Sequence, residues 1–328
     1  MRVTFSDDGR DFLRRDWLGL VHADPAATVF HTPRYLKLYW EEFGHEGDLL
    51  LAFAEDGGET VGAVAFERAG SSLRFLGGTE VTDYMGPVAI PGTEDRVAKE
   101  VVDALQTVDG WNEADLRGLP EDSPWLRRLQ DAAGSAGFVV DVGEDSVAPF
   151  VDLPATWPEY LERLPGKLRH ELKRKHRRLE TDAEWHELRF ADEGTIRQDL
   201  DRFVGLHRAS EGPKGKFMQP GMEIFFRRLA EEFLPDGVFR LAFLQAEGAD
   251  MAGAIGFAFE ARFYLYNSAF DREWRQLAPG MMLVAHLIED AIDSGCRVFD
   301  MLKGDLDYKY RFGAKRRAAK RLAVRLAR

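Results

Sequence analysis

One stretch of the sequence, residues 262–312, constrains the fold more than any other. It begins with RFYLYNSAF, which is rich in aromatic residues. Its side chains alternate with a period of two residues, as they do between the two faces of a β-strand. After Pro279 and Gly280, apolar residues recur at helical spacing as far as Ile292, and Gly295 ends the pattern. The apolar run VFDML follows. The stretch therefore predicts a strand, a loop, a helix and a second strand.

The start of this predicted helix is a candidate binding site. A helix entered through Pro279 and Gly280 points its first free backbone N–H groups beyond the end of the preceding strand. The partial positive charge at a helix N-terminus attracts phosphate groups. A crossover between two strands without any ligand has the same pattern, so the pattern alone leaves both interpretations open.

Length and composition limit the class of protein. The chain has 328 residues, enough for two domains, and its 45% hydrophobic residues suffice for packed cores. No apolar run approaches the roughly 18 residues of a membrane span, and the N-terminus lacks the apolar core of a signal peptide. We therefore expect a cytoplasmic protein. The single cysteine, Cys296, excludes an internal disulfide and a cysteine-rich metal site, and its thiol is expected to be inert.

The net charge of −12 is unevenly distributed along the chain. Residues 1–150 hold 13 lysines and arginines against 28 acidic residues, whereas residues 151–328 hold 31 against 28. The second half is therefore the better host for an anionic ligand.

Both halves show the same order of predicted elements. Helices come first, followed by three strands with short turns, then a loop, a helix and a further strand. This order indicates a degenerate internal duplication, and we predict domains at 1–150 and 151–328. In the first half, a helix over residues 32–43 is expected to open with Thr32 as its cap and Pro33 at its first position. The basic tail after Gly313 is expected to form a final edge strand guarded by lysines and arginines. A surface that binds tRNA is the competing interpretation of the tail.

The order of strands and helices resembles the Gcn5-related acetyltransferase (GNAT) fold. GKLRHELKRKHRRLE (166–180), the block 250–283 and GCRVFDMLKGDLDYKYRFGA (295–314) resemble the CelD-type tandem-GNAT proteins, relatives of the Fem-type peptidoglycan-bridge aminoacyltransferases. The resemblance implies an α/β (α+β) fold with two tandem GNAT-like domains, each a mixed, mostly antiparallel sheet flanked by helices. We expect the donor site in the C-terminal domain, because the N-terminal loop Thr79–Gly92 holds Glu80 and Asp83, which would repel a pyrophosphate. The N-terminal domain is then non-catalytic or acceptor-binding.

The same resemblance implies an acyltransferase. The enzyme would move an acyl group from acetyl-CoA or another acyl-CoA to an amine or hydroxyl, as an N- or O-acetyltransferase. The acceptor would be a small molecule, a polysaccharide or a peptidoglycan precursor. Two alternatives remain open: a Fem-like transferase with aminoacyl-tRNA as the donor, and a catalytically degenerate pair of GNAT domains that serves as a binding module.

The resemblance also assigns residues to the site. Those in the family's donor-binding blocks are Asn267, Ser268, Pro279, Gly280, Met281 and Met282. The family often has Ser-Pro-Gly where this chain has Ala278, so a hydroxyl contact is absent there. The pair Tyr308-Lys309 resembles a Tyr-Lys motif in which the lysine stabilises charge on the carbonyl oxygen, and Asp300 would orient Lys309 or take the acceptor's proton. A turn whose acids and bases only pair with one another is the structural alternative.

Basic residues dominate the helix predicted near residues 167–178. Seven lysines and arginines stand there against Glu171, which indicates either a solvated face or, since like charges repel, a site for an anion. The family resemblance favours the anion. His207 precedes a loop rich in glycine and lysine and is either a general base or a packing histidine. The predicted substrate-binding residues are Tyr84, Arg169, Arg174, His207 and Lys303. The histidines show no metal-ligand spacing, so no metal is predicted.

Overall fold

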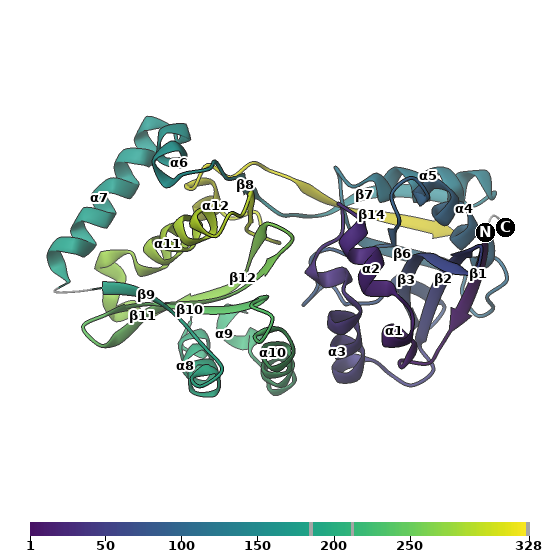
Figure 1. The fold of residues 1–328 in the computed structure, drawn as a ribbon, viewed down its shortest axis with the longest axis horizontal. Helices are drawn as coiled ribbons and strands as arrows, with labels where there is room; N and C mark the ends of the chain where they lie inside the picture. Colours follow the sequence, from purple (N-terminus) through teal and green to yellow (C-terminus); the bar gives the residue numbers. More distant parts are fainter. Residues whose placement is uncertain (184–185, 211–212, 326–328) are drawn as a thin grey trace. The chain divides into compact units, whose positions relative to one another are not determined.

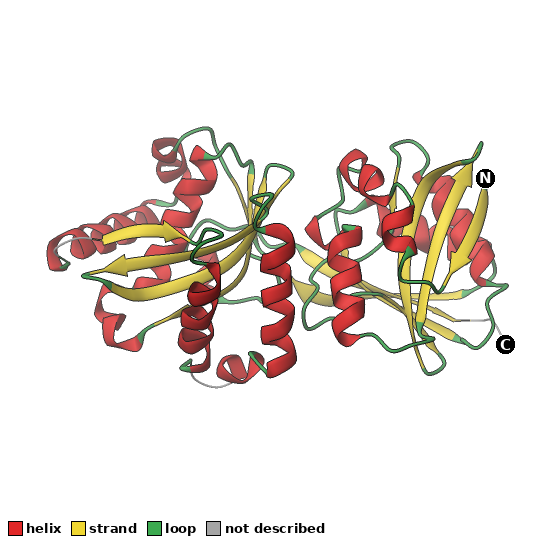
Figure 2. Cartoon of the chain, turned by 60° about the horizontal axis from the view of Figure 1, so that its bottom comes forward, coloured by secondary structure: helices red, strands yellow, loops and turns green. Residues whose placement is uncertain are grey.

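The computed structural model describes residues 1–183, 186–210 and 213–325 and divides the chain into two compact units. Unit 1 comprises Met1–Val147 with Arg317–Arg328, and unit 2 comprises Ala148–Arg316. The predicted C-terminal domain of 151–328 is therefore wrong for its last residues, which belong to unit 1. In each unit, helices flank a sheet (Figure 2). Among the described residues, no helix combines the length and apolarity needed to cross a membrane.

Unit 1 is built on one mixed sheet with the strand order β1-β2-β3-β4-β6-β14-β7, to which a short β5 adds by pairing with β3. Its strands are β1 (Arg2–Ser6), β2 (Leu49–Asp56), β3 (Glu59–Ala69), β4 (Ser72–Phe75), β5 (Val88–Ala89), β6 (Glu113–Pro120), β7 (Val139–Val147) and β14 (Ala318–Arg325). Only β4 and β6 pair in parallel among these described strands.

Helices cover both faces of this sheet (Figure 1). They are α1 (Asp11–Arg14), α2 (Trp17–Ala23), the 3₁₀ helix η1 (Val29–His31), α3 (Pro33–Phe43), α4 (Glu94–Leu105) and α5 (Pro124–Ser135). The sequence placed Thr32 as the cap of α3 and Pro33 at its first position. Both are confirmed, because the Thr32 hydroxyl accepts the N–H of Tyr35.

The C-terminal strand β14 lies inside the sheet of unit 1. It pairs antiparallel with β6 on one side and β7 on the other, so the predicted edge strand is wrong. Its basic residues meet acids of unit 1: Arg321 contacts Asp115, and Lys320 lies 3.9 Å from Glu121 and from Glu144. The acidic excess of the first half therefore neutralises the basic tail, and those cations are not a free surface for tRNA.

Unit 2 repeats the plan with the strand order β8-β13-β12-β11-β10-β9. Its strands are β8 (Phe150–Asp152), β9 (His186–Phe190), β10 (Phe239–Ala246), β11 (Ala249–Phe259), β12 (Arg262–Phe270) and β13 (Val298–Asp300). Only β12 and β13 pair in parallel among the strands described here.

Two groups of helices cover the two faces of this second sheet, with α6, α7 and α11 on one and α8, α9 and α10 on the other (Figure 1). The bounds are α6 (Trp157–Arg163), α7 (Gly166–Asp182), α8 (Ile196–Arg208), α9 (Pro213–Phe217), α10 (Pro220–Phe233), the 3₁₀ helix η2 (Arg272–Leu277), α11 (Pro279–Asp293) and α12 (Asp307–Tyr310).

Helix α11 is the centre of the core of unit 2. Its buried residues pack in one cluster with Ala242, Ala252 and Ala254 of β10 and β11. Such small side chains let a helix approach the sheet closely, which explains why α11 is buried on most of its surface. The strand, helix and second strand predicted for residues 262–312 are confirmed as β12, α11 and β13.

Because β14 is internal, its apolar side chains should stabilise unit 1. Leu322 is fully buried in the core of this unit, and we expect Leu322→Ala to lower the free energy of unfolding of unit 1 by about 2–5 kcal/mol. Arg325→Ala, at the exposed end of the same strand, should cost about 1 kcal/mol or less. Urea unfolding of both variants measures this, and equal effects would contradict the internal placement.

Candidate functional site

Strands β12 and β13 pair over a short distance and then part. The pairs are Arg262 with Val298, Phe263 with Phe299 and Tyr264 with Asp300, and β12 continues from Leu265 to Phe270 beyond the last of them. A register shift against β11 also leaves Tyr266 as an extra residue between Leu265 and Asn267. Such a bulge bends a strand and increases its twist. Within the described chain, the far half of β12 thus has no strand partner on the β13 side.

Helix α11 begins close to this parted strand in the sequence, and its first turn carries no side-chain cap. Ala278, just before the helix, has φ 53° and ψ 52°, a left-handed conformation that costs an L-residue roughly 1–2 kcal/mol. Pro279 has no N–H, so Gly280 presents the first one of the helix. No acidic residue stands in the first turn. Strain of this kind is often held at binding sites, and the helix end is suited to an anion.

The equivalent helix of unit 1, α4, has the opposite chemistry at its start. Its first turn holds Glu94 and Asp95, and the N–H of Gly92 donates to a Glu94 carboxylate oxygen at 2.7 Å. The Asp95 carboxylate pairs with Arg128 at 2.7 Å. Both acids place negative charge near this helix start, which disfavours a phosphate, whereas the first turn of α11 holds no acidic residue.

Asn267 and Ser268, both predicted to bind the donor, lie on the parted half of β12. The Asn267 side-chain oxygen accepts the N–H of Ser268 at 2.9 Å and lies 3.0 Å from Nε2 of His207. Because that oxygen only accepts, Nε2 of His207 carries the proton. His207 is fully buried at the end of α8. The structure thus places His207 behind Asn267, where it holds the carboxamide, and not on a surface that an acceptor can reach.

Lys309 and Asp300, both predicted to be catalytic, organise one loop. The Lys309 ammonium is buried and donates to the backbone carbonyls of Met301, Leu302 and Lys303 at 2.7, 2.8 and 3.0 Å. Asp300 is fully buried at the end of β13, and its carboxylate accepts the N–H of Leu302 at 2.9 Å. Leu302 has φ 54°, so both side chains stabilise a strained turn. An ammonium has three hydrogens, and this loop uses all three.

The other predicted residues near this loop are more accessible. Tyr308, on α12, is 38% exposed, and partial burial raises the pKa of its hydroxyl above the ordinary value. Lys303 is exposed, and its backbone carbonyl accepts a hydrogen bond from the Lys309 ammonium. Tyr308 is therefore the predicted catalytic residue that can still reach a ligand.

The basic helix predicted near 167–178 is confirmed as α7. Arg178 pairs with Asp182 at 3.1 Å, Lys175 lies 4.0 Å from Glu171, and Arg169 donates to the Glu162 carbonyl. In the described part of the chain, no ion pair forms at four other cations of this helix: Lys167, Lys173, Arg174 and Arg177. Arg174 is thus available to an anion, whereas Arg169 is already held at the helix start.

Tyr84, the predicted substrate residue of unit 1, is buried. It is 2% exposed, its hydroxyl accepts a hydrogen bond from Arg317, and the Arg317 guanidinium lies 5.0 Å from the centre of its ring. The pair joins the segment before β14 to the rest of unit 1. A structural role is therefore the simpler interpretation of Tyr84.

Sequence reasoning missed one cluster. His176, His186 and His286 each offer a nitrogen, and these nitrogens lie within 4.8 Å of one another. The expectation of no metal was based on spacing along the chain. Spacing carries no signal here, because three separate elements bring these residues together.

Comparison with known proteins agrees with this geometry. Residues 166–310 match the family model described as "Acetyltransferase (GNAT) domain". No curated protein matches the chain.

Among solved structures, FemX covers 98% of this chain and 97% of its own, with a TM-score of 0.70 and 11% identity. The C-terminal domain of a putative lysylphosphatidylglycerol synthetase from Agrobacterium fabrum covers 98% and 93%, with a TM-score of 0.59 and 13% identity. L-PGS from Bacillus licheniformis covers 88% and 90%, with a TM-score of 0.55 and 14% identity. Identities this low show the fold alone. The predicted fold of two GNAT-like units is confirmed over both halves of the chain.

The Lys309 contacts generate a test that separates structure from chemistry. We expect Lys309→Met to leave three buried carbonyls without their donor and to lower the free energy of unfolding by about 3 kcal/mol or more. Lys303→Met, at the exposed neighbouring cation, should change it by about 0.5 kcal/mol or less. Thermal and urea unfolding measure both effects. If the Lys309→Met protein has normal stability but has lost turnover, Lys309 takes part in the reaction and not only in holding the loop.

Proposed function

From the GNAT acetyltransferase domain that residues 166–310 carry, we infer an acyltransferase. We propose that it moves an acyl group, acetyl in the simplest case, from acyl-CoA to an amine or hydroxyl. The acceptor is a cell-envelope precursor, a polysaccharide or a small molecule. The observation that carries the proposal is the parting of β12 from β13 beside the uncapped start of α11.

The donor would lie along the parted half of β12. Backbone groups of residues 265–270 that face away from β11 are suited to the amides of an extended pantetheine chain, because a strand edge offers alternating donors and acceptors. The pyrophosphate would take the N–H of Gly280 and the positive end of α11. Asn267, Ser268 and Met281 would form the walls, whereas Pro279 and Met282 are buried and would support them from behind. Unit 1 would bind no donor, since Glu94 and Asp95 repel phosphate at the start of α4.

The reaction would be a direct transfer. The acceptor's nitrogen or oxygen attacks the thioester carbonyl and loses its proton to water, and the C–S bond breaks. The CoA thiolate leaves and takes up a proton from Tyr308, which regains one from water. Backbone N–H groups on the parted edge of β12 would stabilise the developing oxyanion. Tyr308 would give the thiolate its proton, because a tyrosine hydroxyl is protonated at neutral pH and this one is partly exposed beside the 301–303 loop. Lys309 and Asp300 would act as positioning residues that hold the 301–303 loop.

A Fem-like transferase with aminoacyl-tRNA as the donor is the second candidate. Two observations favour it: the similarity to FemX over nearly the whole chain, and the exposed cations of α7 that have no acidic partner in the described chain. Arg174 and Arg177 would then contact phosphates. This candidate takes first place if charged tRNA stabilises the protein against unfolding and no acyl-CoA does. The double variant Arg174→Ala, Arg177→Ala should then remove the stabilisation by tRNA, whereas Arg178→Ala should retain it.

A matched pair of variants at Ala278 tests the donor site. Both Asp and Asn tolerate left-handed backbone and cap helices well, so Ala278→Asp and Ala278→Asn should both fold. Only the aspartate places a negative charge against the pyrophosphate. We expect Ala278→Asp to weaken acetyl-CoA binding at least tenfold in calorimetry, about 1.4 kcal/mol, and Ala278→Asn to change it by less than about threefold. If both variants bind acetyl-CoA with equal affinity, the pyrophosphate does not lie at the start of α11.

A second variant tests the proton donor. Tyr308→Phe removes only the hydroxyl, so acetyl-CoA should bind with nearly unchanged affinity while kcat falls by about tenfold to a hundredfold. The release of free CoA thiol during hydrolysis of acetyl-CoA or acyl transfer from it is measured to obtain kcat. Undiminished thiol release by Tyr308→Phe would exclude this role and leave proton transfer to solvent.

A further inference from the structure

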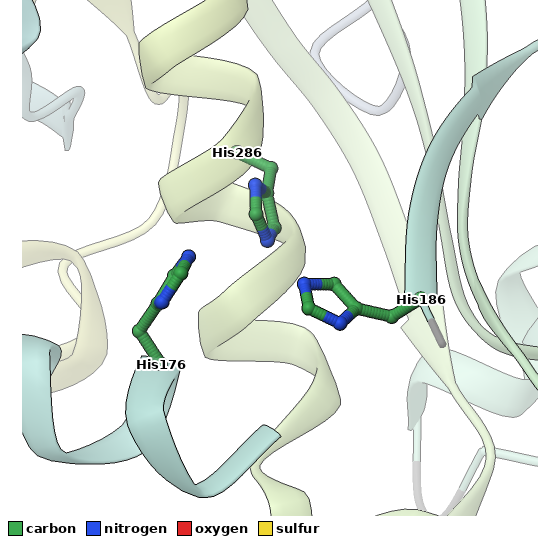
Figure 3. Close-up of side chains that lie close together, drawn as sticks. All are labelled: His176, His186 and His286. Atoms are coloured by element: carbon green, nitrogen blue, oxygen red, sulfur yellow. The ribbon is translucent and has the colours of Figure 1, made fainter. Parts of the chain in front are cut away.

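Three histidines from separate elements converge in unit 2. His176 lies on α7, His186 begins β9, and His286 lies on α11. Their ring centres are 6.1 Å apart for His176 and His186, 5.5 Å for His176 and His286, and 5.8 Å for His186 and His286. Figure 3 shows the three side chains directed toward a common space. The three nitrogens that could serve as ligands lie within 4.8 Å of one another.

One nitrogen of the cluster is a buried polar atom without a partner. Nε2 of His286 is buried and makes no hydrogen bond within the described chain. A buried polar atom without a partner calls for a ligand or ion.

A carboxylate lies beside the outer nitrogen of one ring. Nδ1 of His176 lies 3.4 Å from a Glu180 oxygen, whereas Nδ1 of His286 lies 3.9 Å from a Glu289 oxygen, which is beyond hydrogen-bond distance. A carboxylate that accepts from Nδ1 leaves Nε2 to bind an ion, an arrangement typical of metal-binding histidines.

The space beside the cluster can hold more than an ion. A cavity of about 250 Å³ is lined by His176, His286 and both glutamates, with Lys173 and Arg177 as the opposing charges. The two cations balance the two carboxylates, so the surroundings are close to neutral. The cavity leaves room for a water molecule as a further ligand.

We propose that His176, His186 and His286 bind one divalent transition-metal ion of the zinc type. Tetrahedral zinc with Zn–N bonds of about 2.0–2.1 Å places its nitrogens roughly 3.3 Å apart. The three nitrogens now lie up to 4.8 Å apart, and modest side-chain rotations would bring them to that distance. Three imidazoles suit Zn²⁺, Co²⁺, Ni²⁺ or Cu²⁺ and not Mg²⁺ or Ca²⁺. The ion joins α7 and β9 to α11. Its ligand on α11, His286, lies about 9 Å from Gly280 along the axis of that helix.

The test uses full-length, tag-free protein that has been treated with a chelator. Calorimetric titration with Zn²⁺ should show one ion per chain, and Co²⁺ should give the visible absorption band of a tetrahedral nitrogen site. His176→Asn and His186→Asn should each weaken Zn²⁺ binding at least tenfold. His176 is partly exposed, so its variant should fold normally. The matched control is His170→Asn, an exposed histidine on the same helix, which should bind as the parent does.

The outcomes separate the proposal from weak surface binding. Saturable binding that both cluster variants weaken and the control retains supports the site. Absence of stoichiometric Zn²⁺ binding overturns it, and so does binding that His176→Asn and His186→Asn leave unchanged. Acetyl-CoA binding enters none of these results, so failure of the metal site leaves the proposed donor site untouched.

Discussion

The parting of β12 from β13 is the feature on which the rest of unit 2 depends. Three parallel pairs hold the strands together at Arg262–Tyr264, and the bulge at Tyr266 then turns β12 away. Unpaired backbone groups inside a sheet are costly unless something else binds them. The burial of α11 against small residues of β10 and β11 supplies the stability that allows this opening to persist. An extended, amide-bearing donor is the natural partner for such an edge.

The two units show that one fold carries different chemistry at the same point. In unit 1 helix α4 starts with Glu94 and Asp95, whereas in unit 2 the equivalent helix, α11, starts at a strained, uncapped Ala278. The acids of unit 1 also pair with the arginines of β14. Its charge therefore serves its own stability, which fits a unit without a donor site.

The sequence was informative where structure follows from local patterns. The cap of α3, the basic helix α7 and the run from β12 to β13 depend on neighbouring residues, and all were predicted. The internal position of β14 was not, because pairing with β6 and β7 is decided by residues 171–212 positions away. The roles predicted for Lys309 and His207 stay predictions, and their burial and partners could not be predicted because they depend on the whole unit. The histidine cluster gave no sequence signal for the same reason.

Hydrogen–deuterium exchange with and without acetyl-CoA is the measurement that tests the donor site most directly. If the donor lies on the parted edge of β12 and at the start of α11, bound acetyl-CoA should slow exchange in residues 265–270 and at Gly280–Met282. Exchange at the start of α4, near Glu94, should stay unchanged. Slowed exchange at α4, or none at β12 and α11 under saturating acetyl-CoA, would contradict the account.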